Sequence, residues 1–183
     1  DYDIVVVGAG LVGLALAPTL ARAGLSVALV DRASVATPEP PLAGEGWDVR
    51  VYAISPGSAA FLRAMGGWQH VPTERIAPVE SMRIEGDAGA LLNFSADDLG
   101  ERALAWIVEE RALRAALVPL ARSAGVAVHA PCAFESLTFD PDRGRLRCAD
   151  GNSLSARLVV GADGLRSRVR EAAGIAAATK PYG

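Results

Sequence analysis

The stretch Gly8-Ala9-Gly10-Leu11-Val12-Gly13 follows the apolar, β-branched residues 4–7, and this succession decides the fold. A short continuous apolar run is typical of a strand that is buried on both faces of a parallel sheet. Residues 11–23 have helical spacing and end at Gly24, and residues 27–30 indicate a second buried strand. The sequence therefore predicts a β-α-β unit with the glycines at its first turn.

Each glycine of the turn has a separate use in a dinucleotide-binding site. Gly8 permits the tight turn, Gly10 leaves room for a pyrophosphate to approach the backbone, and Gly13 lets helix and strand pack closely. Leu11 and Val12 begin the helix, whose N-terminus favours an anion. We therefore expect the adenosine half of a dinucleotide at this turn.

Asp31 ends the second predicted strand, 18 residues after Gly13. This is about where a carboxylate accepts hydrogen bonds from a ribose diol. Its charge disfavours the 2′-phosphate of NADP, although the neighbouring Arg32 complicates that argument, so FAD and NAD both remain candidates. The alternative, a glycine-rich turn beside a solvated aspartate, fits the strand-turn-helix context less well.

The remaining chain predicts further elements of an α/β fold. A proline-rich loop is expected over residues 33–46, and helices at residues 58–65, 109–123 and 167–173. Strands are expected at residues 81–85, 91–94, 103–108 and 126–129. Residues 134–139, 145–148 and 154–160, separated by turn sequences, predict a three-stranded antiparallel meander.

Composition excludes several functional classes. A chain of 183 residues, 51% hydrophobic and 21% charged, predicts a compact globular domain, and its net charge of −3 gives no reason to expect nucleic acid. Two histidines leave little for a metal site. Cys132 and Cys148 are too few for a disulfide framework, so we expect two small buried residues in a reduced protein, with a redox pair as the less favoured alternative.

Membrane insertion is also disfavoured by the sequence. The uncharged residues 4–21 reach the length of a membrane-spanning helix, but three glycines and Pro18 interrupt them and no targeting segment is visible. We therefore expect a cytoplasmic location.

A second motif, Gly161-Ala162-Asp163-Gly164, places an acidic residue at the carboxyl end of a predicted strand. Open sheets bind ligands at that edge. Taken alone, however, Asp163 would be expected only to cap the helix that begins near Ser167.

Three motifs occur in a fixed order along the chain: the glycine-rich turn, Asp48-Val49-Arg50-Val51-Tyr52-Ala53-Ile54-Ser55, and the Asp163 motif. In this order the chain resembles the FAD-dependent aromatic hydroxylases. It is most similar to the 2-polyprenylphenol hydroxylases of ubiquinone biosynthesis, which share Asp-x-Arg-x-x-Ala and a Val-Glu-Asn-Arg-like segment. The latter is matched here by Val108-Glu109-Glu110-Arg111, and the resemblance covers essentially the whole chain.

The resemblance implies a Rossmann-like FAD-binding fold and a set of cofactor-binding residues. Residues at the first turn and after the second strand would hold the adenosine and pyrophosphate half of FAD: Gly8, Gly10, Leu11, Val12, Gly13, Asp31 and Arg32. Arg50 and Arg111 would contact FAD farther along, toward the pyrophosphate and the flavin, although an ordinary surface ion pair is the alternative for them. Asp163 and Gly164 would lie under the cofactor, in a motif associated with both FAD and NAD(P)H.

The implied activity is an FAD-dependent monooxygenase that hydroxylates a polyprenylated phenol. It would use NAD(P)H and O₂ through a flavin hydroperoxide, with no catalytic side chain and no metal assigned. The alternatives are a hydroxylase of a soluble aromatic compound, a non-catalytic dinucleotide-binding module and, more weakly, an NAD-linked dehydrogenase. A lipid-tailed substrate would imply peripheral contact with the inner membrane or with a biosynthetic complex.

The resemblance also carries an expectation about domains. Residues 1–183 would form the N-terminal FAD-binding domain, with residues 76–107 partly supplying strands on the substrate side. The family's third motif, a Gly-Asp-Ala-Ala-His-like segment, and the remaining substrate-domain sheet do not occur in the sequence. We therefore expect a portion of a longer enzyme that is inactive alone.

Overall fold

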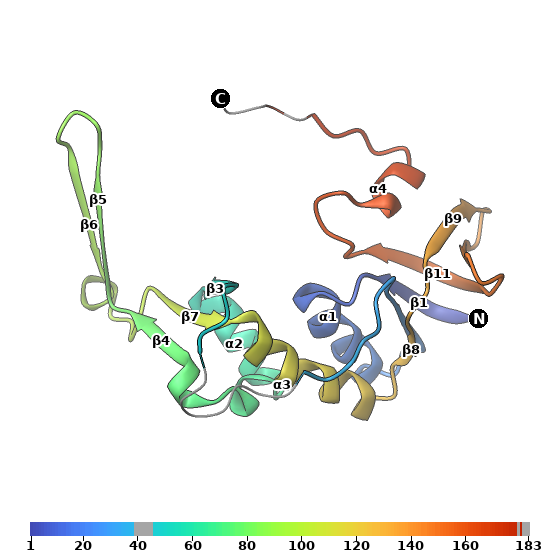
Figure 1. The fold of residues 1–183 in the computed structure, drawn as a ribbon, viewed down its shortest axis with the longest axis horizontal. Coiled ribbons are helices and arrows are strands. Elements are labelled where there is room, and N and C mark those ends of the chain that lie inside the picture. The colour runs from blue at the N-terminus through green and yellow to red at the C-terminus, as the bar shows by residue number, and fades with distance from the viewer. Residues whose placement is uncertain (39–45, 179, 181–183) are drawn as a thin grey trace. The chain divides into compact units, whose positions relative to one another are not determined.

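The computed structural model describes residues 1–38, 46–178 and 180, and the chain divides into two compact units (Figure 1). Unit 1 comprises Asp1–Ala36 and Val118–Gly183, and unit 2 comprises Thr37–Leu117. The predicted proline-rich loop lies partly outside the described residues, because residues 39–45 are not among them.

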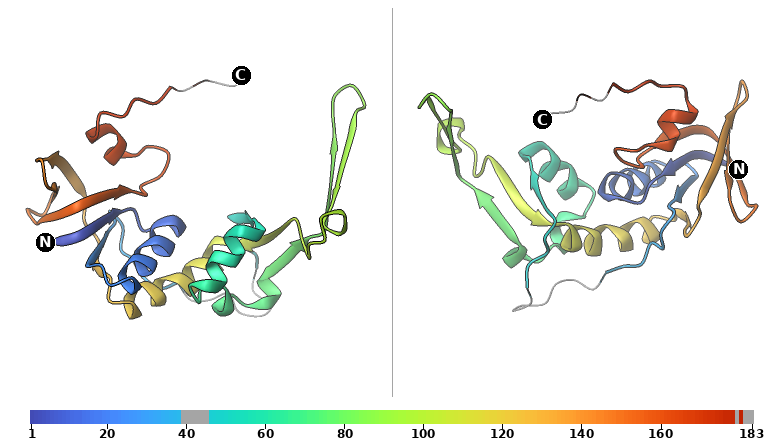
Figure 2. Two further views of the ribbon diagram at one scale, coloured as in Figure 1. Left: turned by 180° about the vertical axis from the view of Figure 1, so that it is seen from behind. Right: turned by 45° about the horizontal axis from the view of Figure 1, so that its top comes forward.

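Unit 1 is built on a six-stranded sheet in the order β8-β2-β1-β11-β10-β9. Four neighbouring strands are parallel, and β10 and β9 continue the sheet in antiparallel fashion. The strands are β1 (Tyr2–Val7), β2 (Val27–Val30), β8 (Ala127–His129), β9 (Phe134–Phe139), β10 (Gly144–Cys148) and β11 (Ser153–Gly161). Helix α1 (Leu11–Arg22) packs against β1 and β2 (Figure 2), and α4 (Arg168–Ala172) follows β11.

The predicted β-α-β unit is confirmed, and its strands are buried as expected. Every residue of β2 is buried, as are the last four of β1, because helices and strands cover both faces of a central parallel strand. Helix α1 continues through Pro18, and Gly24, with φ of 88°, lies just beyond its end. Predicted and observed bounds differ here by one or two residues.

The predicted meander is also confirmed, and it shares a hydrophobic core with the parallel strands. Along β10 buried and exposed residues alternate, which is the pattern of a strand with one face turned to the core. The core cluster contains Val5, Val7, Ala28, Val30, Cys132, Phe134, Leu137, Leu146, Cys148, Leu154, Ala156 and Val169. Because β11 pairs with both β10 and β1, the meander extends the parallel sheet.

Cys132 and Cys148 are joined in a disulfide, so the expectation of two free thiols is wrong. Cys132 precedes β9 and Cys148 ends β10, and the pairing of Cys148 with Phe134 brings the two Cα atoms to 5.6 Å. This separation lies within the usual disulfide range. Closing a loop of this size stabilises a fold by about 3 kcal/mol in the chain-entropy account. The inference of a reduced protein, which rested on free thiols, loses its basis.

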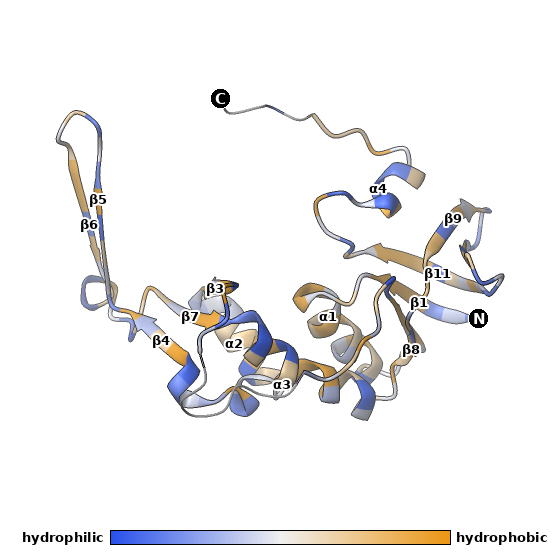
Figure 3. Ribbon diagram, viewed as in Figure 1, coloured by the Kyte–Doolittle hydropathy of each residue, from blue (hydrophilic) through white to orange (hydrophobic). Residues whose placement is uncertain are grey.

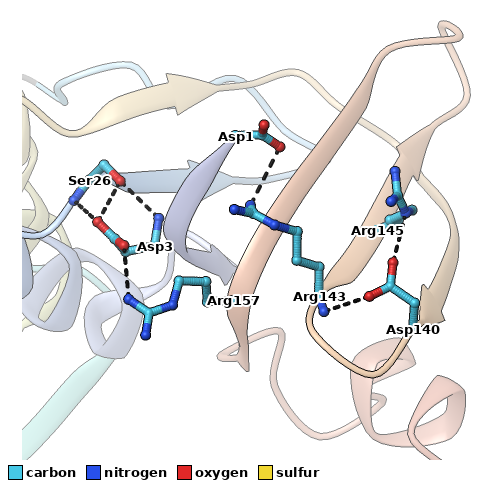
Figure 4. A network of polar contacts seen from close by, with 7 residues as sticks. All are labelled: Asp1, Asp3, Ser26, Asp140, Arg143, Arg145 and Arg157. Carbon is cyan, nitrogen blue, oxygen red and sulfur yellow. Dashed lines mark hydrogen bonds and ion pairs between the residues drawn. The ribbon is translucent and has the colours of Figure 1, made fainter.

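Charged residues join the strands of unit 1 at the amino end of β1 (Figure 4). The Asp3 carboxylate accepts hydrogen bonds from the amide and hydroxyl of Ser26, just before β2, and pairs with Arg157 of β11 at 3.4 Å. The Ser26 amide, followed by the Ser26 hydroxyl, holds the pKa of Asp3 below its ordinary value. Asp3 therefore links three neighbouring strands at the edge opposite the glycine-rich turn.

Unit 2 contains a three-stranded antiparallel sheet in the order β3-β7-β4 and a separate β5-β6 hairpin. Its strands are β3 (Val51–Ile54), β4 (Ile76–Val79), β5 (Ser81–Glu85), β6 (Leu91–Ser95) and β7 (Ala105–Glu109). Its helices are α2 (Pro56–Ala64) and the short η1 (Trp68–His70), η2 (Thr73–Arg75) and η3 (Asp97–Leu99). Helix α3 (Glu110–Ser123) begins here and ends in unit 1. Strand β3 was not predicted, because four residues between a charged segment and Pro56 show no clear period.

One face of the hairpin is apolar, and along β5 polar and apolar residues alternate (Figure 3). Met82 pairs with Phe94 and Ile84 with Leu92, and all four side chains are between 44% and 59% exposed. Arg83 and Glu85 alternate with them and form an ion pair of 2.8 Å.

Within the described part of the chain, no helix combines the length and apolar character needed to cross a membrane.

Candidate cofactor site

The glycine-rich turn joins β1 to α1 at the carboxyl edge of the parallel strands. Gly8 has a φ of 110°, which disfavours any other residue, and its amide donates to the Val30 carbonyl at 2.7 Å. A Cβ on Gly8 would collide with the Ala162 carbonyl, and one on Gly13 would collide with the Gly8 carbonyl. Gly8 thus makes the tight turn and Gly13 serves the close packing that the sequence predicts, and Gly8 also packs closely against the backbone of Ala162.

Gly10 serves a different purpose, because its surroundings are open. Its φ of −72° and ψ of 179° are ordinary extended backbone, and, its two chain neighbours aside, no atom of the described residues lies within 4 Å of an added Cβ. Gly10 is the N-cap of α1, and the first helical bond runs from the Leu14 amide to its carbonyl at 2.9 Å. The space a side chain would occupy is available to a ligand.

The N-terminus of α1 has the properties of an anion-binding site. Across the described residues no side chain accepts a hydrogen bond at this cap, and the first turn contains no acidic residue. The amides of Leu11, Val12 and Gly13 have no carbonyl acceptor within the helix, because the first turn of any helix lacks one. These donors and the positive end of the helix dipole suit a diphosphate, so the residues present fit the predicted dinucleotide.

Asp31 lies beside this turn at the end of β2. Its Oδ2 accepts a hydrogen bond from the Ala9 amide at 2.7 Å, and its Oδ1 accepts one from the Ala33 amide at 2.8 Å. Each carboxylate oxygen has a second acceptor position, so hydroxyl groups of a ribose can still bind. The next residue, Arg32, is exposed. The predicted pairing of a glycine-rich turn with a neighbouring carboxylate is thus present in unit 1.

Asp163 follows β11 and holds the start of α4. Its Oδ1 accepts a hydrogen bond from the Ser167 hydroxyl at 2.5 Å, and its Oδ2 accepts the amides of Arg168 at 2.7 Å and Val169 at 3.3 Å. Burial raises the pKa of the Asp163 carboxyl, but these hydrogen bonds together lower it below its ordinary value. The capping role considered from sequence is therefore present, and Gly164, with φ of 84°, makes the turn between them.

Arg50 and Arg111 lie in unit 2, where the backbone brings them together. The Asp48 carboxylate accepts the Arg50 amide at Oδ1, at 3.0 Å, and the Arg111 amide at Oδ2, at 3.2 Å. The Arg50 amide is the largest cause of the lowered pKa of Asp48, which burial opposes and the Arg111 amide reinforces. The Arg50 guanidinium is 74% exposed and pairs with Glu110 at 3.3 Å. The two sequence motifs around Asp48 and Arg111 thus form one local cluster.

Two residues of this cluster were not predicted from sequence. Arg75, at the end of η2, pairs with Glu109 at 3.2 Å, and each side chain is only 3% exposed. Glu109 also accepts the Asp48 amide at 2.5 Å. Glu109 lies in the segment whose resemblance to the family was noted, but Arg75 carries no sequence signal, because its partner comes from a distant strand.

A strand, a glycine-rich turn with an open helix N-terminus and an aspartate after the next strand define the dinucleotide-binding class of folds. Residues 1–181 match the family described as "FAD binding domain", and the chain belongs to this family. The family resemblance and the fold class expected from the motifs are both confirmed.

Three curated relatives are similar over nearly the whole chain. Identity is 37% to the ubiquinone hydroxylase UbiL of Rhodospirillum rubrum, over 99% of this chain and 41% of the relative. It is 34% to 3-demethoxyubiquinol 3-hydroxylase of Escherichia coli, over 94% and 44%. It is 32% to the mitochondrial ubiquinone biosynthesis monooxygenase COQ6 of Homo sapiens, over 95% and 40%. The chain thus spans about two fifths of these relatives' length.

Solved structures show the same fold. Aklavinone-11 hydroxylase, in a ternary complex with FAD and aklavinone, is 29% identical with a TM-score of 0.67, over 95% of this chain and 35% of that one. A PqsL variant from P. aeruginosa is 25% identical with a TM-score of 0.77, over 99% and 48%.

Proposed function

We propose that the chain is the FAD-binding part of a monooxygenase that hydroxylates an aromatic ring, and that the substrate is a polyprenylated phenol of ubiquinone biosynthesis. The observation that carries the cofactor proposal is the uncapped N-terminus of α1 next to Asp31. The substrate proposal is supported by the three curated relatives, whose names all refer to ubiquinone or its biosynthesis.

The residues of this chain bind and orient the cofactor. In the proposal, the amides of Gly10, Leu11 and Val12 hold the pyrophosphate, which needs the space left by the missing Cβ of Gly10. Asp31 accepts hydrogen bonds from the ribose, with Arg32 beside it. These contacts would hold the adenosine end of FAD.

The other predicted residues would act farther along the cofactor. Arg50 and Arg111 supply positive charge for the phosphates and the flavin end, while Asp163 and Gly164 keep the backbone after β11 in place beside the glycine-rich turn. When bound, FAD supplies the redox chemistry. The overall reaction converts an aromatic C–H, O₂, NAD(P)H and a proton into a phenol, NAD(P)⁺ and water.

A lipid-tailed substrate sets the proposed surroundings of the whole protein. Such a molecule resides in a membrane, so a cytoplasmic enzyme would meet it by peripheral contact with the inner membrane or within a biosynthetic complex. A second substrate class, another aromatic compound, is favoured by the likeness to the hydroxylase solved with aklavinone.

The cofactor proposal is tested by the visible absorption spectrum of the purified chain, before and after addition of FAD and removal of the excess by gel filtration. Retained flavin bands support it. Colourless preparations of this chain and of the complete polypeptide would overturn it. Product analysis on the complete polypeptide, with prenylated and unprenylated phenols, distinguishes the two substrate classes, and bound FAD without any turnover would indicate a non-catalytic binding module.

A further inference from the structure

Both backbone polar groups of Asp31 are bound by one short segment of unit 1. The Asp31 amide donates to the His129 carbonyl at 3.3 Å, and the Cys132 amide donates to the Asp31 carbonyl at 2.7 Å. Val30, the residue before Asp31, pairs with His129 at the end of β8. The course of residues 129–132 therefore fixes the backbone that carries the Asp31 carboxylate.

This segment is bound to the meander by a covalent link. Residues 130–133 lie between β8 and β9 and belong to neither strand. The disulfide joins Cys132 to Cys148, the last residue of β10, and the Ala149 amide donates to the Ala133 carbonyl at 2.8 Å. Both cysteines are buried in the core cluster of unit 1, at 5% and 1% exposure. Cys132 is thus held on two sides, by its amide and by its sulfur.

Strand pairing holds the meander independently of the disulfide. β10 pairs with β9 on one side and with β11 on the other, and the Cys148 amide donates to the Asn152 carbonyl at 2.8 Å. Cys132 precedes β9, so no strand pairing fixes its position. The disulfide therefore restricts Cys132 more than it restricts Cys148, and this restriction reaches the Asp31 carbonyl through one short hydrogen bond.

We propose that the Cys132–Cys148 disulfide positions Asp31 for the ribose of an adenosine nucleotide, so that the affinity of this site depends on the oxidation state of the two cysteines. The inference rests on the proposed cofactor site, and every residue in it belongs to unit 1. A preorganised acceptor loses less conformational entropy on binding than a mobile one. Opening the disulfide therefore weakens the ribose contact while the strands keep their pairing.

The redox step is a thiol–disulfide exchange with a dithiol. The dithiol gives up two electrons and two protons and becomes a cyclic disulfide, while Cys132 and Cys148 each become a thiol. Because both cysteines are buried, the dithiol reaches a sulfur only when the meander opens locally, and we expect a slow exchange. The state of the pair is therefore established by counting free thiols in the unfolded protein after the excess dithiol has been removed.

The first test compares the oxidised, reduced and reoxidised chain, with AMP and 2′-deoxy-AMP as probes. The probes differ only in the 2′-hydroxyl, one of the groups that Asp31 would bind, so the ratio of their affinities reports the ribose contact and not a general loosening of the site. We expect a preference for AMP of about tenfold in the oxidised chain, about threefold or less in the reduced chain, and about tenfold again after reoxidation. Equilibrium dialysis measures both affinities.

A second test removes the disulfide without a reductant. The double variant Cys132→Ala, Cys148→Ala lacks the covalent link but keeps the backbone amide at position 132, which binds Asp31. Thermal unfolding establishes that the variant is folded at the temperature of the binding measurement. We expect its preference for AMP to be about threefold or less, and the amide at position 132 to exchange with solvent at least about tenfold faster than in wild type.

Leu146→Ala is the matched control for weakened packing. Leu146 lies in β10, is 1% exposed and belongs to the same core cluster, but it takes no part in the disulfide. We expect this variant to lose thermal stability, because it leaves a cavity in the core, and to keep the preference of wild type for AMP.

A preference for AMP that persists in the folded double variant would overturn the inference, and so would unchanged exchange of the amide at position 132. An equal loss of the preference in Leu146→Ala would also overturn it, because weaker packing would then suffice as the cause. If the oxidised wild-type chain shows no preference for AMP, the proposed ribose contact of Asp31 fails together with the effect on binding. The amide exchange then decides alone whether the disulfide holds the Asp31 backbone.

Discussion

Two helices, α1 and α4, follow neighbouring parallel strands, and the backbone amides of their first turns have different hydrogen-bond acceptors. Val7 of β1 pairs with Gly161 of β11, so the turns that lead into α1 and α4 lie side by side. At α4, Ser167 caps the Arg170 amide and Asp163 accepts the amides of Arg168 and Val169. At α1 the cap is Gly10, and among the described residues no side chain accepts a hydrogen bond there.

The difference separates a helix end whose amides are bound by its own side chains from one at which no side chain of the described residues binds them. Compared with a Ser or Asp at the N-cap, the glycine forgoes roughly a few tenths of a kcal/mol of stabilisation. Local rules are broken in this way mainly at functional sites. The contrast therefore supports the proposed anion-binding position at α1, and it can be tested by exchanging the properties of the two turns.

The largest effect is expected from Gly13→Ala, which disturbs the packing that both turns need. The new Cβ would collide with the Gly8 carbonyl and lie 3.5 Å from Leu29, and neither backbone nor core can move freely. We expect a loss of unfolding free energy of about 3 kcal/mol or more, with loss of FAD binding. Urea unfolding measures the first and flavin absorption the second. Gly57→Ala, in the open surroundings of α2, is the control and should be at least as stable as wild type.

Gly10→Asp would turn the open helix end into a self-capped one. The extended backbone at Gly10 is that of an N-cap, so the fold should change in stability by only about 0.5 kcal/mol. The carboxylate would occupy the cradle and repel a diphosphate, and FAD affinity should fall about 100-fold or more. Gly10→Ala isolates the effect of volume without charge. Full FAD affinity in the Asp variant, measured by fluorescence titration, would show that the anion binds elsewhere.

The opposite change, Asp163→Asn, would weaken the self-capped helix end. We expect a loss of about 1 kcal/mol at neutral pH, because the charged acceptor for two helix amides is removed. The pKa of Asp163 in the folded state lies below the ordinary carboxyl value of about 4. The stabilisation that its carboxylate supplies is therefore fully present above the ordinary pKa and disappears as the pH falls through the pKa of the folded state. Stability of the variant should therefore decline less than that of wild type between pH 5 and strongly acidic solution. If urea unfolding showed that wild type and variant lose the same unfolding free energy as the pH falls, this expectation would be refuted.

The smallest effect is expected from Glu110→Gln, which removes a counterion supplied by the chain itself. Arg50 is mostly exposed, so breaking its pair with Glu110 should change stability by less than about 0.5 kcal/mol. The released guanidinium should bind the cofactor more readily, which raises FAD affinity about twofold to threefold. A titration that shows weaker FAD binding would instead indicate that Glu110 orients Arg50 for the cofactor.

The sequence was sufficient for features that depend on local pattern. Buried runs, glycine stops and turn residues predicted the β-α-β unit, the meander and α3 to within a few residues, because each depends on neighbours in the chain. The glycine-rich turn and Asp31 were predicted together because their spacing follows from one β-α-β unit.

Features that depend on register or on distant pairing were not predictable in this way. The disulfide follows from the alignment of β9 with β10, and a shift of one residue would have separated the cysteines. Arg75 meets Glu109 because β4 pairs with β7, which no periodicity of either segment reveals. Strand β3 was missed for the same reason, since its partner β7 supplies the hydrogen bonds that define it.

The place of β1 in the sheet has a consequence for synthesis on the ribosome. β1 is made before both of its neighbours in the sheet, which are β2, soon after it in the sequence, and β11, whose Ala156 pairs with Tyr2. One side of β1 therefore stays unpaired until β11 has emerged, and contacts so distant in sequence form slowly. Unit 2 is contiguous in sequence and can acquire its structure first. The glycine-rich turn that follows β1 is then expected to reach its final form later than unit 2.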